Sequence, residues 1–83
     1  MLITGLYDKV AEKYVQYIPT TTIAVLKRDF KAAVNDGKSI YSTSSDDFVV
    51  YTLCSIDDST GECTSQKEFA FNLAELKNES NYQ

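Results

Sequence analysis

The chain has 83 residues, the length of one domain, and carries 8 basic against 12 acidic side chains for a net charge of −4. It contains no histidine, which excludes histidine-based nucleophile pairs and histidine-ligated zinc, and its two cysteines cannot form a four-cysteine zinc site. The net acidity excludes a protein that coats a genome, because affinity for phosphates comes mainly from Lys and Arg. We therefore expect a small, non-catalytic domain without a metal or cofactor.

The first two elements are predicted to be strands. In residues 1–7, Leu2, Thr4 and Leu6 alternate with Ile3, Gly5 and Tyr7, which is typical of a strand. Residues 8–13 are a polar stretch, which is typical of a connection. Tyr14–Ile18 is rich in aromatic and β-branched residues and predicts a second strand. We expect this strand to end at Pro19, because proline has no N–H to donate to a strand ladder.

An amphipathic helix is predicted over residues 21–35. The threonines at positions 20–22 are candidate N-cap residues, and Gly37 is expected to adopt the left-handed conformation that ends many helices. The apolar residues recur at spacings of three and four, so they form one stripe along the helix. They are Ile23, Leu26, Phe30, Ala33 and Val34.

The second half of the chain predicts a β-hairpin. Residues 38–47 are rich in serine and predict a loop, and residues 48–56 are apolar on both faces, which is typical of a central strand. Residues 57–61 predict a turn in which Gly61 takes a positive φ, and residues 62–66 return as the partner strand. The register stays open, because loops of three and four residues both fit.

Two features of this hairpin have more than one interpretation. Cys54 and Cys63 could lie nearly opposite each other, and we expect two reduced side chains rather than a redox or metal site. Residues 67–71 alternate and could form a further strand, whereas residues 72–77 could form a short helical turn.

Two pairs of adjacent acids invite a metal-binding interpretation: Asp46 with Asp47, and Asp57 with Asp58. Adjacent residues of a strand point to opposite faces, so neighbouring carboxylates do not converge by default. The turn at Asp57 also lacks the ligand spacing of a calcium-binding loop. We therefore predict structural roles for these acids and no metal site.

The predicted elements indicate the fold class α+β: a small antiparallel sheet of about four strands, in β-β-α-β-β order, with one amphipathic helix packed on one face. We expect residues 1–77 to form a single domain and residues 78–83 to be a polar, flexible tail. No stretch reaches the ~18 apolar residues of a membrane-spanning helix, so we expect no membrane partner.

The net charge of −4 conceals an uneven distribution. Residues 1–42 hold six basic and four acidic side chains, a net of +2, whereas residues 43–83 hold two basic and eight acidic ones, a net of −6. The basic side chains on and after the predicted helix could contact phosphates or an acidic partner, or could form the solvated face that every amphipathic helix has. They are Lys27, Arg28, Lys31 and Lys38.

Six tyrosines and four phenylalanines supply aromatic surface. Proteins that bind single-stranded nucleic acids stack bases on such rings beside basic side chains, whereas a chain without tryptophan also needs most of its rings in the core. The candidates for stacking are Tyr14, Tyr17, Tyr41 and Tyr51. We assign Tyr14 and Tyr17 to the predicted site.

Four segments of the chain, in this order and spacing, carry a family resemblance. They are residues 6–14 (LYDKVAEKY), 28–36 (RDFKAAVND), 47–53 (DFVVYTL) and 57–62 (DDSTGE). Over about residues 3–62 the chain resembles the small non-structural protein of gokushoviruses, a group of single-stranded DNA bacteriophages in the Microviridae. The resemblance implies synthesis in the cytoplasm of an infected bacterium, absence from the mature virion, and a role in genome replication, single-strand synthesis or packaging. It supplies no catalytic residues.

Two functions follow from these observations. The first is an accessory protein that binds single-stranded DNA as a homodimer, with Lys27, Arg28, Lys31 and Lys38 on phosphates and with Tyr14 or Tyr17 near bases. The second is a protein–protein adaptor, whose acidic half meets a viral replication or assembly protein or a host factor without direct contact to DNA. An enzyme is the least favoured function, because the chain offers no histidine and no convergent acid pair.

Overall fold

The computed structural model describes residues 1–77 and confirms the predicted α+β class and the β-β-α-β-β order. The predicted tail, residues 78–83, lies outside the described residues. The strands are β1 (Leu2–Asp8), β2 (Lys13–Thr20), β3 (Phe48–Ile56) and β4 (Cys63–Asn72). The helices are α1 (Ile23–Val34) and three short segments, α2 (Ile40–Thr43), η1 (Ser45–Asp47) and η2 (Leu73–Leu76). None of these helices has the length and apolar character needed to cross a bilayer.

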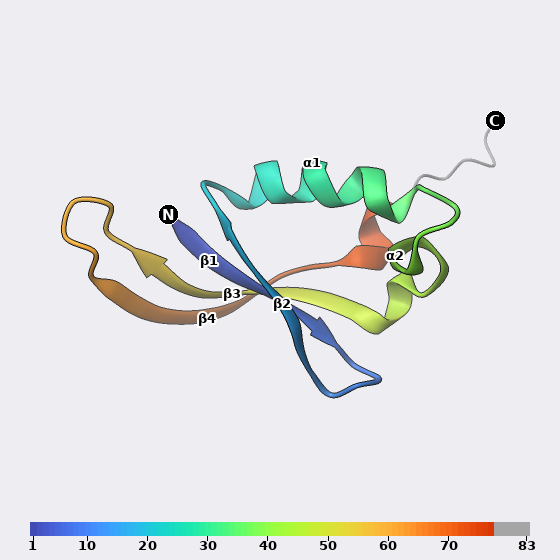
Figure 1. Ribbon diagram of the computed structural model, residues 1–83, viewed down its shortest axis with the longest axis horizontal. Coiled ribbons are helices and arrows are strands. Elements are labelled where there is room, and N and C mark those ends of the chain that lie inside the picture. The colour runs from blue at the N-terminus through green and yellow to red at the C-terminus, as the bar shows by residue number, and fades with distance from the viewer. Residues whose placement is uncertain (78–83) are drawn as a thin grey trace.

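The four strands form one antiparallel sheet in the order β2-β1-β3-β4. β3 is therefore an inner strand, as its apolar character predicted, and β2 and β4 are the two edges. α1 runs along one side of the strands, and the hairpin of β3 and β4 extends beyond the N-terminal end of this helix (Figure 1).

The hydrophobic core lies between α1 and one face of the sheet. Leu26, Phe30 and Val34 lie on the predicted apolar stripe of the helix and are at most 8% exposed. They pack against side chains of three strands, each 0% exposed: Leu6, Val50 and Phe71. Because such a small domain has a thin core, each of these side chains contributes a large share of its stability.

Side chains cap both ends of α1. Thr22 is the N-cap, and its hydroxyl accepts a backbone N–H of the first helical turn at 3.2 Å. At the other end the Asn35 side-chain amide donates to the carbonyl of Lys31 at 2.8 Å. The prediction of a left-handed Gly37 is wrong, because the described glycine with a positive φ is Gly61. The last carbonyls of a helix have no partner within the helix, and a left-handed residue often lets backbone N–H groups bond to them. Here the side-chain amide of Asn35 bonds to one of these carbonyls instead.

Two further predictions, the end of the second strand and the loop after the helix, are also wrong. β2 continues through Pro19 to Thr20, because proline is tolerated on an edge strand where its nitrogen faces away from the neighbouring strand. Residues 38–47, predicted as a loop, contain α2 and η1. Serine hydroxyls favour such short helical turns by capping them, as Ser39 does by accepting the N–H of Tyr41 at 3.0 Å.

β4 is one strand of ten residues, followed by the helical turn η2 that was one of the predictions for residues 72–77. Cys63 pairs with Ile56 and Cys54 pairs with Ser65, so the two cysteines are not opposite each other. Both are free thiols.

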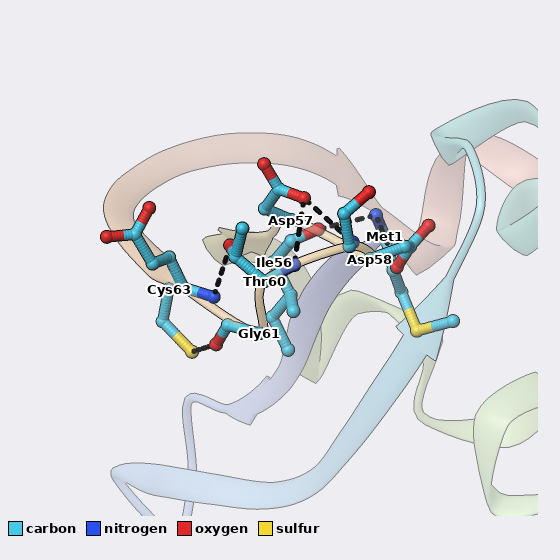
Figure 2. A network of polar contacts seen from close by, with 9 residues as sticks. Met1, Ile56, Asp57, Asp58, Thr60, Gly61 and Cys63 are labelled. Atoms are coloured by element: carbon cyan, nitrogen blue, oxygen red, sulfur yellow. Dashed lines mark hydrogen bonds and ion pairs between the residues drawn. The ribbon is translucent and has the colours of Figure 1, made fainter.

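The turn between β3 and β4 is organised by Asp57 (Figure 2). Its carboxylate accepts the backbone N–H groups of Ser59 and Thr60 at 2.8 and 3.3 Å. Its carbonyl accepts the N–H of Gly61 at 2.7 Å, and Gly61 has a φ of 78°, as predicted. Asp58 lies 3.7 Å from the N-terminal ammonium group. Both acids of this pair therefore have structural contacts, which agrees with the sequence-based interpretation.

We expect Gly61→Ala to lower the free energy of unfolding by about 1 kcal/mol, because a Cβ atom is strained at a positive φ. Gly37→Ala is the matched control, since no atom lies within 4 Å of its Cβ position and its φ is not positive. This control should be neutral or stabilising by less than about 1 kcal/mol. Urea unfolding followed by circular dichroism measures both variants, and equal stabilities would contradict the role assigned to Gly61.

Candidate nucleic-acid interface

The six predicted site residues lie on opposite sides of the sheet. Tyr14 and Tyr17 pair with Tyr7 and Gly5, whereas Leu6, between these two β1 residues, points into the core below α1. Since adjacent residues of a strand point to opposite faces, the two tyrosines lie on the face turned away from the helix, called the outer face below. The four basic residues lie on α1 or just after it: Lys27, Arg28, Lys31 and Lys38. The structure does not bring the predicted basic and aromatic residues into one site.

The basic side chains of the helix have separate surroundings. The Lys27 ammonium lies 5.6 Å from the centre of the Phe71 ring. Arg28 Nε lies 4.0 Å from the carboxylate of Asp29, and both of these side chains are mostly exposed, so their attraction contributes little. Lys31 is exposed, as is Lys38 beyond the helix. These contacts fit the solvated face of an amphipathic helix, which was one of the two predicted interpretations.

A β-bulge places both predicted tyrosines on the outer face. Gln16 pairs with Leu6, but Tyr14 pairs with the next β1 residue, Tyr7, so Val15 is an extra residue in β2. Without this bulge, residues three apart would point to opposite faces. With it, the rings of Tyr14 and Tyr17 stack on the same face, with their centres 5.9 Å apart and their planes at 29°.

A second bulge, in β4, places two nearby aromatic residues on opposite faces of the sheet. Tyr51 pairs with Phe69 and the adjacent Val50 pairs with Phe71, so Ala70 is the extra residue. Without a bulge, Phe69 and Phe71 would share a face. Instead Phe71 is completely buried in the core, whereas Phe69 lies on the outer face and is 56% exposed.

The two bulges complete a line of rings across the sheet. Tyr14 contacts Tyr51 edge to face at 6.3 Å, and Tyr51 contacts Phe69 in the same way at 6.3 Å. Tyr7 lies beside Tyr14 at 5.1 Å. The rings that cross from the β2 edge to the β4 edge, called the aromatic row below, are Tyr17, Tyr14, Tyr51 and Phe69. Aromatic pairs in these geometries stabilise one another, so the row is a preformed surface.

Gly5 lets the Tyr14 ring cross over β1. A Cβ atom at Gly5 would lie 2.7 Å from Cδ1 of Tyr14 and 2.9 Å from Cδ1 of Leu53, closer than carbon atoms approach in proteins. A glycine inside a strand weakens the strand, and here the close approach of the tyrosine ring explains its presence.

Exposure differs along the aromatic row. Tyr17 at the β2 edge is 63% exposed and Phe69 at the β4 edge is 56% exposed, whereas Tyr14 and Tyr51 are half-buried. The Lys67 ammonium lies 5.1 Å from the centre of the Tyr51 ring, within the range of a cation–π contact. The outer face therefore combines two accessible rings with a cation between them, which can stack planar groups and attract an anion.

The sequence offered only part of this surface. Tyr51 was considered for stacking but not assigned, and Phe69 and Lys67 were missed, because simple alternation groups Phe69 with the buried Phe71. Tyr41, also considered for stacking, is half-buried on the core side, where its ring centre lies 5.9 Å from that of Phe30 and 5.4 Å from that of Phe48. The only feature of the sequence that pointed to the row was the presence of two aromatic residues in each of the strands that became the sheet edges, β2 and β4.

Comparisons with known proteins identify a family but no individual relative. The model of the family described as Phage ORF5 protein matches residues 1–76. No curated protein matches the chain. No solved structure matches it either. Within residues 1–77, no group of three acidic or cysteine side chains is placed to hold a metal ion.

Proposed function

The chain belongs to the Phage ORF5 protein family, and we propose that it binds single-stranded DNA on the outer face of its sheet. In this proposal it is an accessory protein of genome replication, single-strand synthesis or packaging in a gokushovirus of the Microviridae. It acts by binding rather than by catalysis, in the cytoplasm of the infected bacterium and outside the mature virion.

The aromatic row is the observation that carries the proposal. Two of its four rings are more than half exposed, and the contacts between neighbouring rings join them into one aromatic surface across the sheet. An unpaired base stacked on an aromatic side chain contributes about 1–3 kcal/mol and can have any sequence. Four-stranded sheets with aromatic side chains on an open face are a recurring platform for single-stranded nucleic acids.

The charge of the protein sets the expected strength of binding. A net charge of −4 disfavours extensive phosphate contact, so stacking must supply most of the affinity. Lys67 brings one positive charge to the row. We therefore expect modest affinity that falls only gently with salt, because the salt dependence scales with the number of phosphates neutralised.

Fluorescence anisotropy with a labelled thymidine oligonucleotide of about 20 residues, long enough for one binding site, tests this proposal. We expect Tyr17→Ala combined with Phe69→Ala to weaken binding at least tenfold, or about 1.4 kcal/mol, because two stacking surfaces are lost. The matched control reverses charge on the other side of the sheet, with Lys27→Glu combined with Lys31→Glu. This helix variant should bind within about threefold of the wild type, because it affects the outer face only through longer-range electrostatics, and its amide spectrum shows whether losing the Lys27 contact with Phe71 leaves the fold intact.

Two outcomes would contradict the proposal. One is the absence of binding by the wild type even at about 50 mM salt, where phosphate contacts are strongest. The other is unchanged binding by the aromatic variant. A loss seen only with the helix variant would move the site to Lys27 and Lys31. A duplex of the same sequence should bind more weakly, because its bases are paired and cannot stack on the row.

A protein–protein adaptor is the second candidate, and the open edge of β4 favours it. Seven consecutive residues, Cys63–Phe69, are exposed along this edge. The other edge contains Pro19, which has no N–H for an added strand, so β4 is the better acceptor for a strand of a viral protein, a host factor or a second copy. Affinity purification from infected cells, with and without nuclease treatment, tests this. A stoichiometric protein partner that remains after nuclease treatment supports the adaptor, and recovery of DNA alone from the untreated lysate contradicts it.

A further inference from the structure

We propose that the bound DNA strand crosses the sheet from β2 to β4, with one base on Tyr17, another on Phe69, and a phosphate between them held by Lys67. This inference rests on the proposed function and adds to it the path and the minimum length of the DNA. It also distinguishes the two terminal rings of the aromatic row, on which bases stack, from the two inner rings that support them.

The ends of the row are the places where a base can stack without rearrangement. Tyr17 and Phe69 are each more than half exposed, and each contacts one other ring among the described residues. Tyr14 instead contacts three rings, which enclose it. Tyr51 contacts two rings at their edges and has the Lys67 ammonium above it. A base on either inner ring would have to displace these neighbours, so the inner rings support the outer ones.

Lys67 lies where the backbone between two stacked bases must pass. Its ammonium is 5.1 Å from the centre of Tyr51, which stands between the two terminal rings in the row. A lysine ammonium is a compact charge with three donors, which suits a phosphate. The neighbouring Glu68 pairs with the buried Thr52, so its side chain belongs to the opposite face and does not cancel this charge on the row.

The width of the sheet sets the length of DNA that can use both rings. Adjacent strands lie about 4.8 Å apart, so the two edges of four strands are separated by about 14 Å. Stacked nucleotides advance about 3.4 Å each along a strand, so about four such steps, or about five nucleotides, span this distance. A dinucleotide can therefore occupy one terminal ring but cannot bridge the two.

The test measures how the loss of affinity caused by removing one ring depends on the length of the oligonucleotide. Thymidine oligonucleotides of two to about eight residues, a range that brackets the predicted span, are titrated into the wild type, Tyr17→Ala and Phe69→Ala and followed by NMR chemical shifts. For the dinucleotide, each single variant should weaken binding about twofold or less, because the other ring remains available. For six or more nucleotides, each should weaken it about fivefold or more, because the lost stacking also removes the bridge.

Lys67→Ala tests the phosphate contact separately. We expect it to lower the magnitude of the slope of log affinity against log salt by about 0.7 for the longer oligonucleotides, because one phosphate of a single strand is no longer neutralised. Lys38→Ala, which removes an exposed lysine beyond the helix, is the matched control and should leave the slope unchanged. Amide spectra of all variants confirm that they are folded, and Tyr17→Leu provides a second variant that keeps apolar bulk without an aromatic face.

The results separate this inference from the proposed function. If the wild type binds long oligonucleotides but the effect of each ring is the same at every length, the bridging path is wrong and the binding function stands. The same holds if Lys67→Ala leaves the salt slope unchanged. If the wild type binds no single-stranded DNA at low salt, the proposed function itself fails.

Discussion

Phe71→Ala is expected to lower the free energy of unfolding by about 3–5 kcal/mol, as for other large core side chains replaced by alanine. Phe71 is 0% exposed and its ring centre lies 6.3 Å from that of Phe30 on α1. A domain of this size has a total stability of about 4–12 kcal/mol, so this one change removes a large part of it. Urea unfolding at equilibrium measures the loss.

Phe69→Ala, two residues away on the same strand, is the matched control. Phe69 is 56% exposed on the outer face, so its removal should change stability by less than about 1 kcal/mol. Equal losses for the two phenylalanines would mean that β4 has no bulge at Ala70 and that both rings share one environment. The same variant is also expected to weaken DNA binding, so it separates the proposed binding role of Phe69 from the structural role of Phe71.

Gly5→Val is expected to destabilise the protein by about 1–3 kcal/mol, the usual range for forcing extra atoms into a packed site. A Cβ atom at this position already meets Cδ1 of Tyr14 at 2.7 Å, and valine adds two methyl groups to it. The displaced Tyr14 ring would interrupt the aromatic row, so DNA binding should weaken together with stability. Urea unfolding and anisotropy on the same samples measure the two effects.

Two further variants make the Gly5 prediction specific. Gly37→Val adds the same side chain where no atom lies within 4 Å of the Cβ position, so it should change stability by less than about 0.5 kcal/mol. Combining Gly5→Val with Tyr14→Ala removes the ring that causes the clash, and the double variant should lose less stability than the sum of the two single variants. Additive losses would show that Gly5 and Tyr14 do not compete for the same space.

The two bulges explain why the alternation of a strand sequence does not predict which side chains share a face in β2 and β4. Side chains of a regular strand alternate, so alternation places Tyr14 and Tyr17 on opposite faces and Phe69 with Phe71 on one face. An extra residue in β2 and another in β4 reverse both relations. Whether a bulge forms depends on pairing with a neighbouring strand, so no local pattern of the β2 or β4 sequence could reveal it.

The predicted site divides for a related reason. The basic residues of the helix and the tyrosines of β2 were grouped into one site because proteins that bind single-stranded nucleic acids combine aromatic rings with basic side chains. α1 must bury its apolar stripe of Leu26, Phe30 and Val34, and it does so against the sheet face that carries Leu6. Its charged side is thereby separated from the outer face by the sheet itself. The cation that accompanies the rings is instead Lys67, which comes from the far half of the chain.

The residues alone were enough to predict the amphipathic helix, the central strand and the turn at Gly61, and they contain no histidine. These features follow from composition and from local periodicity, which act within a few residues. Which charges and rings share a surface became clear only from the fold, because this depends on strand order, on bulges and on the face that the helix covers. The net charge of −4 therefore describes the whole chain, whereas the candidate site is an aromatic row with one lysine on a single face.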